Sequence, residues 1–278
     1  MKLSIITINY NNIIGLQKTI DSVIVQTWKD FEWIIIDGGS TDGSKELIEQ
    51  YQQYFAYWCS EPDKGVYNAM NKGIAIAKGE YLNFMNSGDT FYSDKTLEGI
   101  FCTHFNEDMV YGDWIRIEKL GNVFIQAPDK VSLDFFYSYN ICHQAMFIKT
   151  DLMKVCGYDE SFEIYADWAR WIKMLWDNCS TKHIPMVVCY FDAQDGLSRR
   201  SGEKLIIERE RVRGIIPPAV REPIGRLNDY NSCLEVKDTY SLSNESRLYR
   251  KMIRMNLLFV KSLKRIVDIV RTILQKCK

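Results

Sequence analysis

Several features that mark common protein classes are missing from this sequence. Its eight cysteines are scattered and form no Cys-x-x-Cys pair, which argues against a disulfide framework or a zinc site and favours reduced thiols. No apolar run approaches the roughly 18 residues of a membrane-spanning helix. The short apolar run at the N-terminus is typical of a buried strand and not of a signal peptide. We therefore expect a cytoplasmic protein.

An excess of charge of either sign is also missing. The formal net charge is -1, so bulk electrostatics predicts no nucleic-acid partner. The last segment differs, because residues 247–278 hold ten basic residues and only one acidic residue, Asp268. Apolar residues in 246–278 also recur along one face at the period of a helix. This basic amphipathic helix would pack on its own domain or contact the inner face of a membrane as a peripheral element.

The first half of the chain alternates strand and helix patterns. Strands are expected over 3–9, 31–37, 54–59 and 80–86, with helices between them. One helix opens at Asn11 and Asn12, the next is capped by Thr41 or Asp42, and the third runs over 66–78 and stops at Gly79. This alternation predicts an α/β fold with a doubly wound, mostly parallel sheet.

The second half is less regular. We expect a β pair over 109–117 and 122–125, a strand end at 139–142, a helix over 167–177, a strand over 183–192 and a helix over 203–213. Prolines at 217, 218 and 223 predict a loop-like stretch to about residue 244. The resulting domains are 1–200 and a C-terminal helical extension over 201–278.

Four acidic motifs stand in order along the chain, and the first three follow strand-like runs. Carboxyl ends of parallel strands gather at one edge of such a sheet, where ligands bind. Several carboxylates at one edge favour a bound cation, and a cation beside a nucleotide diphosphate suggests group transfer from an activated donor. The motifs are residues 34–42 (IIIDGGSTD), 61–65 (EPDKG), 86–89 (NSGD) and 166–168 (ADW).

Each motif has a chemical reading beside a structural one. Asp37, at a strand end, suits hydrogen bonding to a base or ribose, whereas a tight turn is the alternative. Lys64, at the start of a helix, would contact a diphosphate or remain a surface charge. Asp89 would give an oxygen to a divalent cation or form an Asx turn. Asp167 is a general base if the nearby indoles desolvate it, and otherwise a helix cap. His143 would be a neutral donor, a metal ligand or a structural residue.

The order of the motifs resembles that of the family 2 glycosyltransferases of GT-A fold, above all bacterial enzymes that build surface polysaccharides. The resemblance covers residues 1–200 and is strongest over the first 90. It is carried by residues 4–11 (SIITINYN), 37–43 (DGGSTDG), 61–65, 86–89 and 166–168.

The resemblance implies a role for each matching residue. Thr7, Asn9 and Asp37 would hold the nucleoside, and Lys64 would lie near the diphosphate or ribose. Asp89 matches the last acid of the family's DxD metal motif, which implies Mn²⁺ or Mg²⁺ as the cofactor.

The same resemblance makes Asp167 the catalytic base. Two positions depart from the family pattern, because Asn86 replaces the first acid of DxD and Ala166 replaces the glutamate before the base. Asn86 and His143 are left as acceptor-side or secondary residues.

The implied reaction moves a hexosyl or N-acetylhexosaminyl group from a nucleotide-sugar, in the first instance a UDP-sugar, to a hydroxyl of a saccharide or lipid-linked acceptor. One displacement at the anomeric carbon inverts it, and no second carboxylate motif is assigned as a nucleophile, so inversion is expected. A nucleotidyltransferase and a non-catalytic nucleotide- or carbohydrate-binding module stay open as alternatives. The absence of membrane-spanning runs disfavours a membrane-embedded polysaccharide synthase.

Overall fold

The computed structural model describes residues 1–194 and 202–226. The chain divides into two compact units, Met1–Val212 and Arg213–Lys278. The sheet, its helices and every candidate site residue belong to the first unit. In the described part of the second unit, residues 218–226 are helical, so the loop expected there is wrong. Pro218 opens that helix, at a position where a missing N–H costs nothing.

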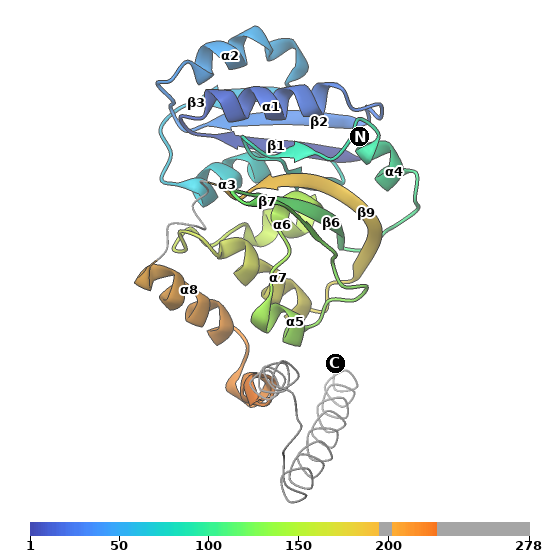
Figure 1. Ribbon diagram of the computed structural model, residues 1–278, viewed down its shortest axis with the longest axis vertical. Coiled ribbons are helices and arrows are strands. Elements are labelled where there is room, and N and C mark those ends of the chain that lie inside the picture. The colour runs from blue at the N-terminus through green and yellow to red at the C-terminus, as the bar shows by residue number, and fades with distance from the viewer. Residues whose placement is uncertain (195–201, 227–278) are drawn as a thin grey trace, which may run out of the picture. The chain divides into compact units, whose positions relative to one another are not determined.

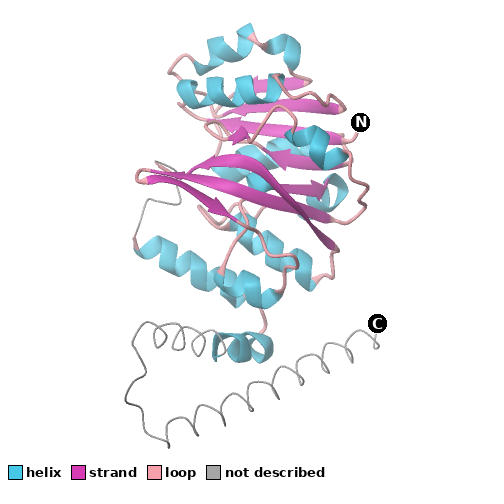
Figure 2. Ribbon diagram, turned by 45° about the vertical axis from the view of Figure 1, so that its right-hand side comes forward, coloured by secondary structure: helices cyan, strands magenta, loops and turns pink. Residues whose placement is uncertain are grey.

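A single mixed sheet organises the first unit (Figures 1 and 2). Among the described residues it has nine strands. Eight follow the order β3-β2-β1-β4-β8-β6-β9-β5, and β7 lies off this path and pairs with β6. The bounds are β1 Leu3–Asn9, β2 Phe31–Asp37, β3 Tyr57–Ser60, β4 Tyr81–Phe84, β5 Thr90–Phe91, β6 Met109–Glu118, β7 Gly121–Ile125, β8 Met146–Lys149 and β9 Thr181–Asp192.

The four strands at one end of the sheet are parallel and form a doubly wound half. β1 pairs with both β2 and β4, and β2 pairs with β3. The chain therefore runs outward from β1 to β3 and then returns to β4 on the other side of β1. This reversal is a switch point, and open α/β sheets generally bind ligands beyond the carboxyl ends of their strands at such a point. Every residue of β1 is buried, as expected for a strand covered on both faces.

Helices connect these parallel strands, and such crossovers are right-handed as a rule. α1 Ile13–Ile24 and α2 Ser44–Gln50 follow the outward path, and α3 Val66–Ile76 follows the return, which places α3 on the opposite face. The remaining helices are α4 Thr96–Phe101, α5 Leu133–Ser138, α6 Thr150–Cys156, α7 Ala166–Trp176 and α8 Glu203–Gly214, and short 3-10 turns η1 and η2 span Gln52–Tyr54 and His143–Ala145.

The strand over 3–9, the strand over 31–37 and the β pair are where the sequence placed them, but several element ends differ. Gly43, with φ of 94°, is the N-cap of α2, so capping by Thr41 or Asp42 is wrong. α3 ends at Ile76 and not before Gly79. A Cβ on Gly79 would lie 2.4 Å from the backbone carbon of Leu3, so this glycine permits close packing on β1 and not a helix end.

Two further expectations about strands are corrected. Tyr54 belongs to η1, so β3 begins only at Tyr57. Residues 139–142 form no strand, and Cys142 is the extended N-cap of η2, which leads into β8. The turn of η2 is what aims His143 and Gln144 toward the edge of the sheet.

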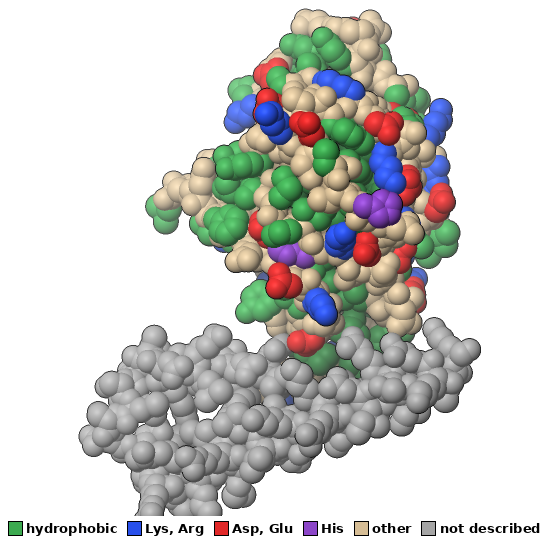
Figure 3. All heavy atoms as spheres, turned by 90° about the vertical axis from the view of Figure 1, so that its right-hand side faces the viewer, with side chains coloured by type: hydrophobic (Ala, Val, Ile, Leu, Met, Phe, Trp, Pro, Cys, Tyr) green, Lys and Arg blue, Asp and Glu red, His purple; other side chains and the backbone are tan. Residues whose placement is uncertain are grey.

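The surface of the first unit carries both signs of charge. On the face shown in Figure 3, acidic and basic side chains are interspersed between apolar ones. In the described ranges, no helix is both long enough and apolar enough to cross a bilayer. The expected basic amphipathic helix at 246–278 lies outside the described residues.

Candidate active site

The carboxyl ends of β1, β2 and β3 meet in register at one edge of the sheet. Asn9 pairs with Asp37, and Asp37 pairs with Ser60. The loop that follows β4, which holds Asn86 and Asp89, emerges on the same edge because β4 is parallel to β1. Three of the four acidic motifs therefore reach one edge, as the alternation of strands and helices predicted.

Asp37 is fully buried, and the protein itself satisfies its carboxylate. Oδ1 accepts from Asn9 Nδ2 at 2.7 Å and from the Ser40 hydroxyl at 2.6 Å. Oδ2 accepts from Ser40 N at 2.9 Å and from the Ser60 hydroxyl at 2.6 Å. Asp37 thus ties the ends of three strands to the turn after β2. Direct contact between Asp37 and a nucleoside stays a prediction.

The two other nucleoside residues also lie inside the edge. Thr7 has no exposed surface, and its hydroxyl donates to the carbonyl of Met85 at 2.8 Å and accepts from Trp33 Nε1 at 3.0 Å. This geometry gives Thr7 a structural role and does not favour contact with a ligand. Asn9 differs, because its buried Oδ1 has no hydrogen-bond partner among the described residues.

A more exposed surface lies beside the turn after β2, and the sequence analysis missed its aromatic residue. Tyr10, directly after β1, is 66% exposed, and its ring lies 3.1 Å from where a Cβ on Gly38 would stand. The Asp63 carboxylate lies 2.5 Å from the same point. Gly38 therefore leaves room for Tyr10 and Asp63 to approach each other. An aromatic residue immediately after a buried strand was the signal available in the sequence.

Lys64 and Asp42 have simpler surroundings. Lys64 is exposed just before α3, and among the described residues its ammonium has no hydrogen-bond partner, which leaves it available to a ligand. Asp42 accepts from Ile13 N at 2.8 Å, at the start of α1, and from Ser44 N at 3.1 Å, at the start of α2. Its carboxylate thus contacts the first residue of both helices, although Asn12 and Gly43 hold their N-cap positions.

The loop after β4 is fixed from α1. The Thr19 hydroxyl donates to the carbonyl of Asp89 at 2.7 Å, lies 3.1 Å from the carbonyl of Asn86 and accepts from Gly88 N at 3.0 Å. Asp89 is 5% exposed, and its oxygens accept from Gln144 Nε2 and from Asp192 N. Burial raises the pKa of the Asp89 carboxyl to about 7, although both of these hydrogen bonds favour the charged form.

Asp167 lies at the start of α7. Its Oδ1 accepts from Trp168 N at 2.7 Å, and its Oδ2 has only long contacts, at 3.3 Å to His143 Nδ1 and at 3.4 Å to Asn140 Nδ2. Tyr67 lies 3.3 Å from Oδ1, but its single proton is engaged at 2.5 Å with the carbonyl of Ile164. Oδ2 is therefore the less committed oxygen, which suits proton transfer.

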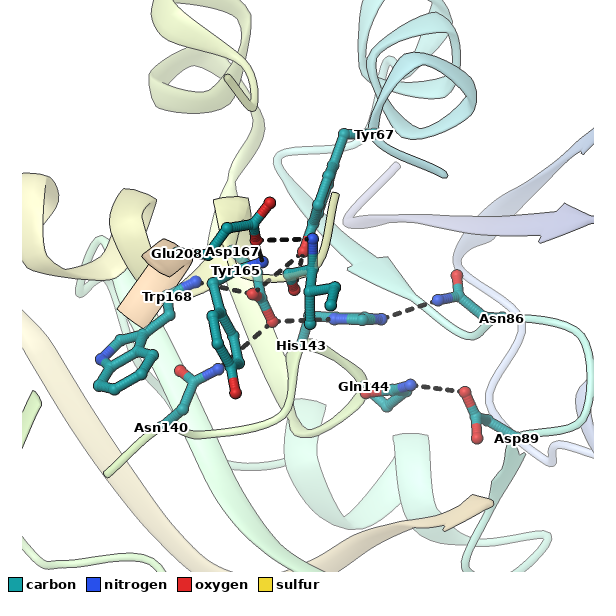
Figure 4. A network of polar contacts seen from close by, with 11 residues as sticks. Tyr67, Asn86, Asp89, Asn140, His143, Gln144, Tyr165, Asp167, Trp168 and Glu208 are labelled. Carbon is teal, nitrogen blue, oxygen red and sulfur yellow. Dashed lines mark hydrogen bonds and ion pairs between the residues drawn. The ribbon is translucent and has the colours of Figure 1, made fainter. Parts of the chain in front are cut away.

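His143 and Gln144 join Asp89 and Asp167, which lie far apart in the sequence (Figure 4). His143 Nδ1 faces Asp167, and its Nε2 lies 2.8 Å from Asn86 Nδ2. The neighbouring Gln144 donates to Asp89. The structure thus brings Asp89 and Asp167 to the two sides of η2, with Asn86 beside them.

A residue from α8 supports the segment before Asp167, and no local pattern in the sequence indicates it. Glu208 is buried, and its carboxylate accepts from the amides of Glu163, Ile164 and Tyr165, at 2.6, 3.0 and 3.2 Å. Three successive amides form an anion-binding nest, which here holds the chain's own carboxylate. Figure 4 shows Glu208 next to Asp167.

The chain supplies few groups for a closed metal site. Within the described ranges, no three His, Cys, Asp or Glu side chains are grouped so that they could hold an ion. The protein offers two buried carboxylates, Asp89 in the loop after β4 and Asp167 on the far side of His143.

Comparison with known proteins identifies the family of this chain. The family model described as glycosyl transferase family 2 matches residues 4–178. An uncharacterized glycosyltransferase of Mycobacterium tuberculosis (strain ATCC 25618 / H37Rv) is 36% identical over 216 residues, which cover 76% of this chain and 82% of the relative. A PGL/p-HBAD biosynthesis glycosyltransferase of Mycobacterium bovis (strain BCG / Pasteur 1173P2) is 31% identical over 218 residues, which cover 74% and 82%.

The fold is shared with a solved structure. S. aureus TarS 1-349 in complex with UDP-GlcNAc superposes with a TM-score of 0.64 and 18% identity, over 81% of this chain and 70% of that one. At this identity the likeness concerns the fold alone, which is GT-A. The family match extends over more than half of the chain, through all four acidic motifs. The chain belongs to glycosyl transferase family 2 and is a glycosyltransferase.

Proposed function

We propose that this enzyme transfers a hexosyl or N-acetylhexosaminyl group from a UDP-sugar to a hydroxyl of a saccharide or lipid-linked acceptor, with inversion, in the synthesis of a surface polysaccharide. The observation that carries the proposal is the placement of Asp167 across η2 from the Asp89 loop. One carboxylate then lies at the donor crevice and the other where an acceptor would enter.

The donor would bind at the carboxyl ends of β1 to β4. Exposed Tyr10 offers a ring for a base, Asn9 has an unpaired buried oxygen nearby, and Lys64 offers a positive charge for a diphosphate. The choice of UDP follows the resemblance and agrees with the ligand in the TarS structure. The role in a surface glycan agrees with the name of the mycobacterial relative.

Asp89 fits a cation site that is completed by the substrate. Each of its oxygens accepts one hydrogen bond from the protein and keeps a lone pair, so Mn²⁺ or Mg²⁺ could use this carboxylate together with diphosphate oxygens and water. When bound, such an ion neutralises the negative charge that develops on the leaving diphosphate. A nearby cation would also favour the charged form of a carboxyl whose pKa burial has raised to about 7.

Asp167 is the proposed general base. Its Oδ2, held only by long contacts, takes the proton of the acceptor hydroxyl as that oxygen attacks the anomeric carbon. The attack comes from the side opposite the leaving diphosphate, so a single displacement inverts the centre. A retaining reaction would need a second carboxylate as a nucleophile, and we assign that role to no residue.

A panel of nucleotide-sugars tests the proposal, with thermal shift for donor binding and analysis of the released nucleotide for chemistry. We expect one UDP-sugar to raise the melting temperature more with Mn²⁺ than without it, because a ligand that binds only the folded state stabilises it. Incubation with acceptor should release UDP and form a product of inverted anomeric configuration by NMR. Release of pyrophosphate would indicate a nucleotidyltransferase, and stabilisation without any product a binding module.

A further inference from the structure

The imidazole of His143 bridges two loops that are distant in the sequence. Its Nδ1 lies 3.3 Å from Asp167 Oδ2, and its Nε2 lies 2.8 Å from Asn86 Nδ2. The ring stands edge-on to Phe84 with centroids 6.2 Å apart, and the side chain is only 16% exposed. The imidazole is thus held on three sides, between the base and the loop at the donor crevice (Figure 4).

Hydrogen-bond chemistry sets the protonation pattern of this bridge. An ionised carboxylate can only accept, so the Nδ1 that faces Asp167 must carry a proton. In the neutral imidazole the other nitrogen, Nε2, then accepts, and the amino group of Asn86 is the donor beside it. This placement of the imidazole proton requires a side chain at position 86 that can donate a hydrogen bond to Nε2.

The hydrogen bond between His143 and position 86 explains why this chain has asparagine there and not the aspartate of the family's DxD pattern. An aspartate at position 86 would face Nε2 with an acceptor and would require a proton there as well. The imidazole would then be a cation between two carboxylates. Asparagine instead matches a neutral ring whose only proton points at Asp167.

We propose that His143 is a positioning residue for the catalytic base: as the neutral tautomer protonated at Nδ1, fixed by Asn86, it orients Asp167 Oδ2 for proton abstraction. The inference rests on the proposed role of Asp167. In this proposal Asn86 fixes the tautomer of His143 and does not bind a cation. Since Gln144 holds Asp89 from the next position, the 143–144 dipeptide would set the spacing of both acids.

Two substitutions distinguish the contributions of Nδ1 and Nε2 of His143. In His143→Asn the side-chain amide can stand near the place of Nδ1 and still donate to Asp167. In His143→Gln the amide reaches toward the place of Nε2 and leaves Asp167 without this donor. We expect kcat to fall about 10- to 100-fold in His143→Gln, the cost typical of a lost orienting partner, with KM for the donor unchanged. His143→Asn should stay within about threefold of the wild type.

The exposed His104→Gln substitution serves as the matched control and should behave as the wild type. In an Asp167→Asn background, His143→Gln should cost nothing further, because residues that act as a unit are non-additive. Equal losses in His143→Asn and His143→Gln, with melting temperatures intact, would show that the ring itself does the chemistry and would overturn the proposal. So would full activity in His143→Gln.

NMR spectroscopy tests the hydrogen bonds of His143 without a measurement of sugar transfer. The chain has three histidines, so ¹⁵N-labelled histidine gives three imidazoles, which single substitutions assign. We expect His143 to be neutral and protonated at Nδ1, and to gain a proton at Nε2 in Asn86→Asp. An Nε2-protonated neutral ring in the wild type contradicts the inference. If the wild type transfers no sugar from any donor, the proposed function fails. The tautomer observed for His143 still tests the proposed hydrogen bonds to Asp167 and Asn86.

Discussion

Three acids of the candidate site differ in how many of their carboxylate oxygens already accept hydrogen bonds from the protein. Asp37 accepts four hydrogen bonds from its own chain and is fully buried. Asp89 accepts two hydrogen bonds, and burial raises the pKa of its carboxyl to about 7. Asp167 has one strong partner on Oδ1 and loose contacts on Oδ2. This gradation fits a scaffold residue, a cation ligand and a base.

Replacing Asp167 by asparagine should remove proton abstraction and leave donor binding in place. General-base assistance contributes roughly 10²–10⁴-fold, so we expect kcat to fall by that order. Asparagine keeps an oxygen for Trp168 N, which preserves the start of α7. The measurement is steady-state transfer beside donor titration by calorimetry. Turnover equal to that of the wild type would take the base role from Asp167.

Asp89 should make the stability of the metal-free protein depend on pH. Its folded pKa of about 7 is above the unfolded value near 3.8, so the folded state binds the proton more tightly. The free energy of unfolding should therefore fall as pH rises from about 4 to about 7 and stay lowered above that. Asp89→Asn, which cannot ionise, lacks this contribution.

Urea denaturation in EDTA at pH 5.5 and pH 8 checks the sign. The wild type should lose more stability than Asp89→Asn between the two pH values. An identical pH dependence in both proteins would mean that Asp89 does not titrate in this range.

At the scale of elements, α7 carries Asp167, the proposed base, but α8 holds the segment that leads into it. Besides Glu208 in the amide nest, Arg211 reaches the Ser161 carbonyl at 3.1 Å and lies 4.0 Å from the centre of the Phe162 ring. Lys204 pairs with Glu163 at 2.8 Å, an exposed contact of little weight. The docking of α8 thus depends mainly on one buried carboxylate.

Glu208→Ala should destabilise the first unit and reduce transfer together. Three amides would lose a charged acceptor, and hydrogen bonds to charged groups are worth about 1.5–3 kcal/mol each before partial replacement by water. We expect a loss on the order of 2–3 kcal/mol by urea denaturation. Arg209→Ala, an exposed neighbour on α8, is the control and should change stability by less than about 0.5 kcal/mol. An unaltered midpoint for Glu208→Ala would exclude α8 as a support of the base.

At the scale of the whole molecule, the last segment of the chain differs in charge from the rest. Residues 247–278 carry a strong basic excess in a chain of net charge -1, so the remainder is acidic. A lipid-linked acceptor would bring the enzyme to an anionic surface, where each basic residue near the headgroups contributes about 1 kcal/mol. Peripheral contact through 246–278 stays a prediction, as does the domain boundary at residue 200; the compact units divide after Val212.

Deleting residues 246–278 should weaken binding to anionic liposomes without ending hydrolysis of the donor. Co-sedimentation with vesicles of phosphatidylglycerol and phosphatidylcholine measures the first, and release of UDP measures the second. Neutral vesicles are the control, and binding should weaken with salt because the attraction is electrostatic. Undiminished sedimentation of the truncated protein would refute a membrane role for this segment.

The sequence by itself determined the doubly wound half, because burial on both faces requires near-continuous apolar strands and the polar motifs that follow them must emerge at one edge. It determined Asp37 and Asp89 as candidates for the same reason, and Asp167 through its place at a helix start beside indoles and through the family resemblance. Only the tertiary structure decided that Asp42 contacts the start of α1, that Asp37 is enclosed, that η2 ties Asp89 to Asp167 and that Glu208 supports the segment before Asp167. These contacts join residues that are 24 to 55 positions apart in the chain, and no local periodicity records them. Hydrogen bonds between distant segments form only where packing of the core has already fixed the distance between their elements.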